Sequence, residues 1–155
     1  MGLVPLIQNK EEIDLLFISE YRPATDRFMI EFPGGLLDDG EFPIQTAIRE
    51  LHEETGYHVG SMMEGYTPLF TFESPWISRG FCITFVVSID EHDPRNKKLK
   101  KHLDKEEIIS NVIVRDIRPD NIGSKVADLC KKKGYGLSVC VGSFVQGVEL
   151  ANYLD

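Results

Sequence analysis

Residues 34–57 read GGLLDDGEFPIQTAIRELHEETGY. Residues 43–55 of this stretch have the periodicity of an amphipathic helix, with a proline at the first position and Gly56 directly after the last. Helix ends favour this placement of proline and glycine. The apolar residues of the helix fall on one stripe and are Ile44, Ala47, Ile48 and Leu51. We expect this stripe to pack against a sheet.

The other face of the predicted helix is acidic. Glu50, Glu53 and Glu54 stand at positions i, i+3 and i+4, so their carboxylates project from one face within about 6 Å of axial rise. Like charges this close repel one another unless a cation lies among them, and Mg²⁺ binds carboxylate oxygens while keeping positions for water and substrate phosphates. Arg49 directly precedes the cluster and can orient a carboxylate, and Gly35 allows the backbone to approach it closely.

A glutamate-rich helix face is usually a solvated surface, so a metal site needs further support. A longer pattern supplies it: Gly35, five residues, Glu41, seven residues, then RELHEETGY at residues 49–57. This pattern resembles the Nudix box, G-x5-E-x7-R-E-U-x-E-E-x-G-U, in which U is a bulky apolar residue. Seven fixed positions, each with roughly one chance in fifteen, match at random on the order of once in 10⁶ sequences of this length. Tyr57 stands where the family has an aliphatic residue and keeps its bulk.

The resemblance implies a hydrolase that cleaves a nucleoside diphosphate linked to another moiety, with Mg²⁺ or Mn²⁺ bound on the helix of the box. It implies that Glu50 and Glu54 are the principal metal ligands. Glu53 would be a further ligand, direct or through water, with a part in catalysis. Arg49 would orient these carboxylates, and Glu41 would hold the preceding loop to the helix. The implied fold is α+β, an α/β/α sandwich around a mixed β-sheet.

The similarity extends beyond the box. YRP at residues 21–23 and EFPGGLLDDGE at residues 31–41 look like the ADP-ribose and ADP-sugar pyrophosphatases of the family, which read Y/F-R-P and E-F-P-A-G-x-x-D-x-G-E. By this match Arg22 would contact the diphosphate and Glu31 would lie at the site. Gly34, which stands where these enzymes usually have alanine, would offer its carbonyl to a metal ion.

Further site residues are expected outside these motifs. The catalytic base of this group of enzymes is a carboxylate on the loop before a late strand, which is Glu106 or Glu107 here, and we favour Glu107. Relatives usually build part of the adenine pocket and of a dimer from several dozen residues before the box domain, and this sequence begins close to that domain. We expect Trp76 to stack on the base in place of part of that pocket, with ordinary loop packing as the alternative. A homodimer is a further expectation from the family.

The rest of the chain indicates strands and two more helices. Runs rich in β-branched and aromatic residues predict strands over residues 2–7, 14–21, 27–32, 66–73, 80–89 and 108–114. Helices are expected over residues 121–133, followed by Gly134, and over residues 138–153, with Ser138 as the N-cap. Strands in runs, with helices between and after them, indicate an α+β layer structure.

The amino-acid composition limits the classes of protein to which the chain can belong. The 155 residues fit one domain over residues 1–155, and 42% hydrophobic with 27% charged residues exclude a disordered or membrane-spanning chain. The net charge of −8 argues against nucleic acid or a membrane as a partner. Three cysteines without a CxxC spacing indicate a reduced protein without structural zinc, in the cytoplasm or the nucleus.

The charge is unevenly distributed along the sequence. Residues 35–57 hold six acidic residues and the single base Arg49, so most of the negative charge lies at the predicted cation site. Residues 90–105 hold six lysines and arginines. This basic stretch is typical of a solvated loop, and a surface that steers phosphates is the alternative.

These features predict Mg²⁺-dependent hydrolysis of a small-molecule nucleoside diphosphate sugar, ADP-ribose or a related ADP-sugar, to AMP and a sugar phosphate. Another Nudix substrate class is the alternative, such as GDP-sugars, dinucleotides or oxidised nucleoside triphosphates, because the box reports the chemistry and not the base. A non-catalytic nucleotide-binding module is less favoured, since it has no need of three glutamates that repel one another. mRNA decapping would need a larger basic groove.

Overall fold

The computed structural model of the chain describes residues 1–9, 12–72 and 79–154. Its strands are β1 (Gly2–Asn9), β2 (Glu12–Arg22), β3 (Arg27–Glu31), β4 (Ser61–Met62), β5 (Leu69–Phe72), β6 (Phe81–Ile89), β7 (Ile109–Val114) and β8 (Gly136–Leu137). Its helices are α1 (Pro43–Thr55), α2 (Ile122–Lys133) and α3 (Val139–Ala151), with short 3-10 helices at Pro23–Thr25 and Pro94–Lys97.

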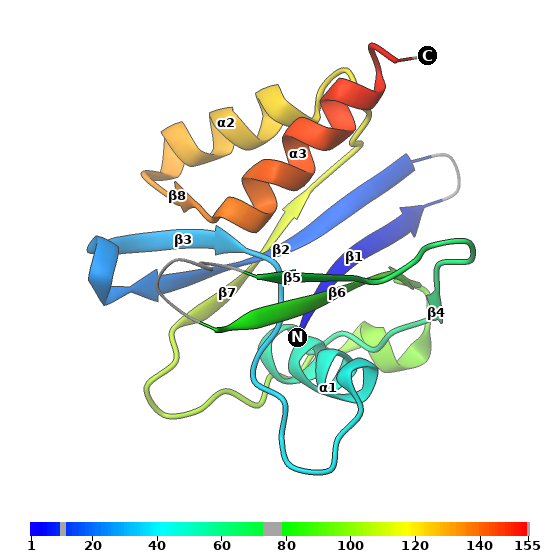
Figure 1. Cartoon of the computed structure of the whole chain (residues 1–155), viewed down its shortest axis with the longest axis vertical. Helices are drawn as coiled ribbons and strands as arrows, with labels where there is room; N and C mark the ends of the chain where they lie inside the picture. The colour runs from blue at the N-terminus through cyan, green and yellow to red at the C-terminus, as the bar shows by residue number, and fades with distance from the viewer. Residues whose placement is uncertain (10–11, 73–78, 155) are drawn as a thin grey trace.

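The strands form one mixed eight-stranded sheet (Figure 1). Its order is β4-β6-β1-β2-β3-β8, with β5 also paired to β6 and β7 to β2. The β1–β6 and β3–β8 pairs are parallel, and the other pairs are antiparallel. The first residues of β2 pair with β1 and its last residues pair with β3. β2 therefore connects β1 and β3 within the sheet.

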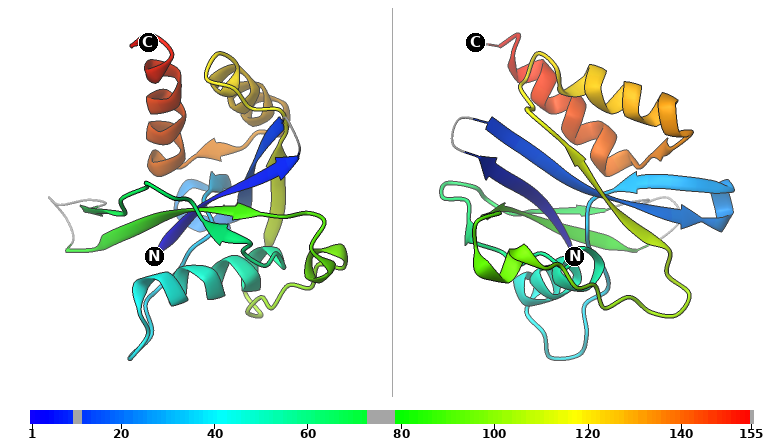
Figure 2. Two further views of the ribbon diagram at one scale, coloured as in Figure 1. Left: turned by 90° about the vertical axis from the view of Figure 1, so that its right-hand side faces the viewer. Right: turned by 180° about the vertical axis from the view of Figure 1, so that it is seen from behind.

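Helices cover both faces of this sheet (Figure 2). α1 packs on one face over a buried cluster of Leu3, Ile7, Leu16, Ala47, Leu51, Tyr57, Phe85, Val87 and Ile89. α2 and α3 pack on the other face over Val4, Leu15, Phe17, Ile30, Val114, Ile122, Val126, Val141 and Val145. The α/β/α sandwich around a mixed sheet is thus confirmed. No helix in residues 1–9, 12–72 and 79–154 is long and apolar enough to cross a membrane.

The ends of several elements differ from the sequence prediction. The strand expected at residues 66–73 is shorter, since β5 covers Leu69–Phe72 and residue 73 lies outside the described residues. β4 and β8 are not predicted, because two residues are too few to show a period of two. α2 and α3 each begin one residue later than expected, because Asn121 and Ser138 occupy the N-cap positions, and α3 ends at Ala151.

α1 has the predicted bounds and a corrected buried face. Gly56 ends it with a φ of 78°, a left-handed conformation that glycine adopts at little cost. Ala47 and Leu51 are fully buried as expected, whereas Ile48 is 38% exposed. The face on the sheet runs instead towards Glu54 and the other buried helix residues, Thr46 and Thr55. One carboxylate of the acidic cluster therefore lies in the interior.

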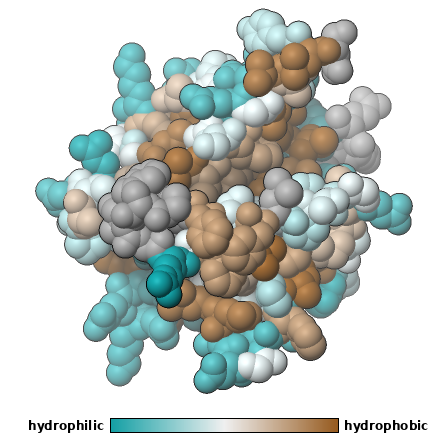
Figure 3. Space-filling model, in the orientation of Figure 1, coloured by the Kyte–Doolittle hydropathy of each residue, from teal (hydrophilic) through white to brown (hydrophobic). Residues whose placement is uncertain are grey.

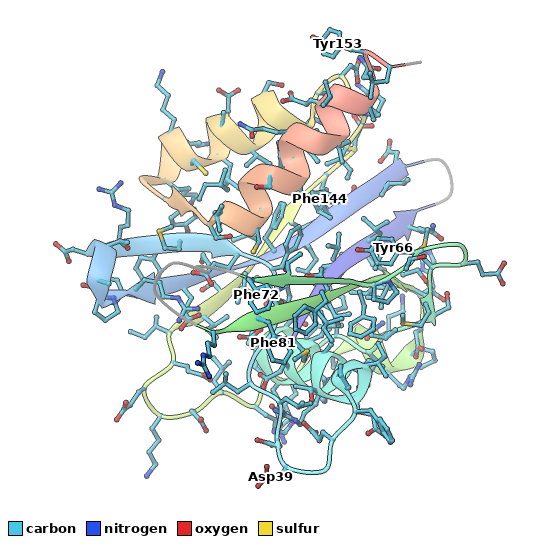
Figure 4. All side chains as sticks on the ribbon, in the orientation of Figure 1. Asp39, Tyr66, Phe72, Phe81, Phe144 and Tyr153 are labelled. Atoms are coloured by element: carbon cyan, nitrogen blue, oxygen red, sulfur yellow. The ribbon has the colours of Figure 1, made fainter. Side chains whose placement is uncertain are left out.

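The loop between β3 and α1 is attached to the first residues of β1. Gly2 and Gly34 form an antiparallel bridge, and the Leu3 N–H donates to the Pro33 carbonyl at 3.0 Å. The loop then extends outward, with Asp39 at its far end (Figure 4). This attachment holds the backbone at Gly34 against the carboxylates of α1.

The packing of α1 gives a first prediction. Leu51→Ala should lower the free energy of unfolding by about 2–5 kcal/mol, because the removed methyl groups leave a cavity between α1 and the sheet. Ile48→Ala, on the same helix, should cost less than about 1 kcal/mol because its side chain is partly solvated. Urea unfolding followed by circular dichroism measures both. Equal losses in the two variants would contradict this packing of α1.

Candidate active site

A cavity of about 500 Å³ opens at the N-terminal end of β1. Its wall includes Arg22 from β2, Glu31 from β3, and Gly34, Gly35 and Leu36 from the loop before α1. Residues from β6 and from the start of α3 complete it, among them Phe81, Cys82, Thr84, Ser138, Val139 and Cys140. The fold thus places residues that are distant in sequence around one opening beside α1.

Arg49 lies at the centre of the acidic cluster on α1. Its Nε and Nη2 donate to the two carboxylate oxygens of Glu41, both at 3.0 Å. Its Nη1 donates to Glu50 at 2.8 Å and to Glu53 at 3.0 Å. Hydrogen bonds from Arg49, and one from the Thr46 hydroxyl, lower the pKa of Glu41 to about 2. One guanidinium therefore fixes three carboxylates, and it ties the end of the loop to the helix.

Glu50 lies directly against the backbone of Gly35. A Cβ atom built on Gly35 would overlap the Glu50 carboxylate, so only glycine leaves room for that carboxylate. Burial raises the pKa of Glu50, the hydrogen bond from Arg49 opposes this shift, and the charges of Glu53 and Glu107 add to it.

Glu54 is the most buried carboxylate of the cluster, with 6% of its surface exposed. Its Oε2 accepts a hydrogen bond from the Gly34 N–H at 3.0 Å. The pKa of Glu54 is raised to about 8, mainly by burial; the Gly34 N–H opposes this shift, and the nearby charges of Glu50, Glu20 and Glu107 add to it. A Cβ atom on Gly34 would overlap the Met1 carbonyl. Only glycine therefore fits at this position without a shift of the backbone.

A divalent cation fits this donor set. Glu50 and Glu54 offer carboxylate oxygens, and burial together with mutual repulsion disfavours their ionised forms until a positive charge is near. Within residues 1–9, 12–72 and 79–154, no three Asp, Glu, His or Cys side chains form a group that could hold a metal ion. Mg²⁺ is usually held in proteins by one or two carboxylates and completed by water and substrate phosphates.

Arg22 lies in the cavity wall between two carboxylates. Its Nε and Nη2 donate to Glu31 at 3.0 and 2.8 Å, and Nη2 also lies 2.8 Å from Glu20. Across the described part of the chain, Nη1 has no hydrogen-bond partner, which leaves its two N–H groups for a ligand. The structure therefore brings Arg22 and Glu31 together, as the motifs imply.

Glu20 is a residue of this site that the motifs do not indicate. It stands two residues before Arg22 on β2, so both side chains lie on the same face of the sheet. Burial raises its pKa, the charge of Arg22 lowers it, and Glu31 and Glu107 raise it. The alternation of charged residues near the end of a predicted strand is the signal that could have found it.

The two candidate bases differ in their surroundings. The charge of Glu107 raises the pKa of Glu20, Glu50 and Glu54, so its carboxylate lies close to the cluster. Both side chains are exposed, and among the described residues the charge of Glu106 perturbs none of these three carboxylates. Glu107 Oε2 accepts the Asp104 N–H at 2.9 Å, which holds the side chain in a turn. This geometry favours Glu107, whose role stays a prediction.

Two other expectations concern Trp76 and the basic stretch at residues 90–105. Trp76 lies outside the described residues, so its stacking stays a prediction. The basic stretch at residues 90–105 is largely exposed but is anchored by buried Asn96, which bonds to the backbone of His58 and Asp90. Lys101 of this stretch is partly buried, donates to the Ile109 carbonyl at 3.1 Å and lies near enough to Glu54 for their charges to interact.

Comparison with known proteins establishes the family. A family model described as NUDIX domain matches residues 1–120. The chain therefore belongs to the Nudix family, whose hydrolases generally use divalent metal ions, and the resemblance found from the box is confirmed. The crystal structure of a Caenorhabditis elegans Ap4A hydrolase binary complex superimposes with a TM-score of 0.52 at 18% identity, covering 99% of this chain and 96% of that one. At this identity the similarity concerns the fold alone.

Curated relatives include pyrophosphatases. The chain is 33% identical over 130 residues to an uncharacterized Nudix hydrolase of Schizosaccharomyces pombe, covering 84% of this chain and 60% of that protein. It is 28% identical over 154 residues to the ADP-ribose pyrophosphatase of Saccharomyces cerevisiae, covering 97% and 63%. It is 33% identical over 90 residues to the ADP-sugar pyrophosphatase of Mus musculus, covering 57% and 39%. The chain thus spans less than two thirds of the length of these relatives.

The buried carboxyl of Glu54 gives a prediction for the metal-free protein. An unfolded Glu54 ionises near 4.5 and the folded one near 8, so the folded state binds the extra proton between these values. Stability is then fully present below pH 4.5 and falls as the pH rises towards 8, by about 1–3 kcal/mol. Partly buried Glu20 and Glu50 shift in the same direction. Urea unfolding at pH 5 to 8 with EDTA measures this loss.

Glu54→Gln should flatten that dependence, because the amide carries no charge to bury. Glu106→Gln, which changes an exposed carboxylate, should leave the loss unchanged. Addition of Mg²⁺ at pH 8 should stabilise the original chain and not the Glu54→Gln variant. If Glu54→Gln still lost stability between pH 5 and 8, the loss would belong to another titratable group.

Proposed function

We propose that this chain hydrolyses the diphosphate bond of a nucleoside diphosphate sugar, ADP-ribose or a related ADP-sugar, to AMP and a sugar phosphate, with Mg²⁺ or Mn²⁺. The observation that carries the proposal is that Gly34 and Gly35, which line the same cavity as Arg22, lie directly against the carboxylates of Glu54 and Glu50. The names of the Saccharomyces cerevisiae and Mus musculus relatives support the substrate class. The proposal treats residues 1–155 as one domain, since all three helices pack on one sheet.

The carboxylates of α1 would hold the cation. Glu50 and Glu54 would bind it directly, the Gly34 carbonyl would add an oxygen, and Glu53 would bind directly or through water. A bound divalent cation would neutralise the diphosphate, polarise the P–O bond and lower the pKa of water. Arg49 would keep Glu50 and Glu53 in place while Glu41 compensates its charge. These residues therefore form a rigid support for charge that develops at phosphorus.

Two further side chains would act on the substrate. The Nη1 group of Arg22 would donate to phosphate oxygens while Glu31 and Glu20 hold the other side of the guanidinium. Glu107 would accept a proton from the attacking water at Oε1, because Oε2 is engaged by the Asp104 N–H.

A substrate panel tests the proposal. ADP-ribose, ADP-glucose, GDP-mannose, diadenosine tetraphosphate and 8-oxo-dGTP are incubated with Mg²⁺, and the products are separated by chromatography. We expect AMP from ADP-ribose or ADP-glucose, and no turnover in EDTA. Glu54→Gln should lower kcat at least about 10²-fold with the fold intact by circular dichroism. Pyrophosphate release from the triphosphate alone would contradict the substrate class, and normal turnover by Glu54→Gln would contradict metal catalysis on α1.

The neighbouring glutamates provide a matched pair for the base. Glu107→Gln should lower kcat about 10²- to 10⁴-fold and leave KM nearly unchanged, because the amide cannot accept the proton. Glu106→Gln should stay within about threefold of the original chain, because the charge of Glu106 does not act on the carboxylates of the cluster. Initial rates from pH 6 to 9 measure both variants. The reverse order of effects would make Glu106 the base.

A further inference from the structure

Three phenylalanines gather on the hairpin of β5 and β6. Phe70, Phe72 and Phe81 are 54%, 55% and 44% exposed. Phe72 pairs with Phe81 across the two strands, and Phe70 lies two residues before Phe72, so all three side chains share one face of the sheet. Figure 3 shows apolar surface gathered at the centre of this side of the molecule, and Figure 4 labels Phe72 and Phe81 there. Large exposed aromatic side chains in contact with one another mark a binding surface.

Phe81 is the member of this group that reaches the candidate active site. It lines the cavity shared by Arg22 and Gly34, whereas Phe70 and Phe72 are not among its lining residues. The Phe70 ring stacks on the Phe81 ring, with centroids 4.4 Å apart and planes 22° from parallel. Phe70 therefore covers part of the Phe81 ring and restrains its orientation, while the exposed part of Phe81 belongs to the cavity.

The sheet order separates Phe81 from the charged residues of the same cavity. In the sheet order β1 lies between β6, which carries Phe81, and β2, which carries Arg22. Arg22 and Glu31 make one part of the wall ionic, and Phe81, with exposed Leu36 and Val139, makes another part apolar. A nucleoside diphosphate sugar has the same division, because its diphosphate is charged and its base is a flat π system.

We infer that Phe81 is the ring on which the nucleobase of the substrate stacks, an inference that rests on the proposed function for the rest of the ligand. A base laid on Phe81 would extend the parallel Phe70–Phe81 stack, an arrangement favourable for aromatic rings in contact. The assignment places base recognition on β6 of this chain.

Binding of the product AMP tests the inference without turnover. Isothermal titration calorimetry with Mg²⁺ compares AMP with ribose 5-phosphate, which lacks the base. Phe81→Leu keeps an apolar side chain but removes the ring, and it should weaken AMP binding about tenfold while leaving ribose 5-phosphate within about twofold. Phe81→Trp should bind AMP within about threefold of the original chain, because it restores a π face. Phe72→Leu is the matched control and should leave both affinities unchanged.

Several outcomes would overturn the inference. AMP binding by the original chain no tighter than that of ribose 5-phosphate would show that the base gains no contact. Equal losses in Phe81→Leu and Phe72→Leu would assign the effect to the whole hairpin. A dimer in sedimentation velocity that dissociates in both variants would make the three rings a contact between two copies. If the chain bound AMP more tightly than ribose 5-phosphate but hydrolysed no diphosphate, the proposed function would be contradicted and the stacking on Phe81 would still hold.

Discussion

The close approach of the backbone at Gly34 and Gly35 to the carboxylates of α1 is the constraint on which the site depends. The Gly34 N–H binds Glu54, and Gly35 leaves the space that the Glu50 carboxylate occupies. A side chain at either position would overlap a neighbour, so two glycines keep the loop within hydrogen-bonding distance of the helix. The bridge from Gly2 to Gly34 then ties this contact to the sheet. Loop, helix and sheet therefore share one point of attachment.

The electrostatics of the site follow from that attachment. Because the loop covers Glu54, its carboxylate is buried and its pKa rises to about 8. Arg49 offsets part of the repulsion by binding Glu41, Glu50 and Glu53. The net charge of −8 is thus concentrated where a cation fits, and a bound cation would reverse the local sign. An acidic protein can in this way attract a diphosphate.

The topology of the sheet determines which other residues reach this charge. β1 and β3 pair with different halves of β2, so the end of β2 carries Arg22 to the cavity while β3 carries Glu31. β6 pairs with the opposite edge of β1 and brings Phe81 to the same opening. The charged residues of the cavity therefore come from β2 and β3, and the aromatic residue comes from β6. The proposed substrate spans the same two chemistries.

Features with a local origin could be read directly from the amino-acid order. The bounds of α1, the shared face of Glu50, Glu53 and Glu54, and the family all follow from spacing along one helix and its preceding loop. Features that depend on partners distant in the chain could not. Pairing of β2 with β3 and β7 brings Glu20 and Glu107 to the cluster, helix packing turns Ile48 outward, and strand order places Phe81 in the cavity. Strand register and packing are set by contacts between segments, so they cannot be predicted from one segment alone.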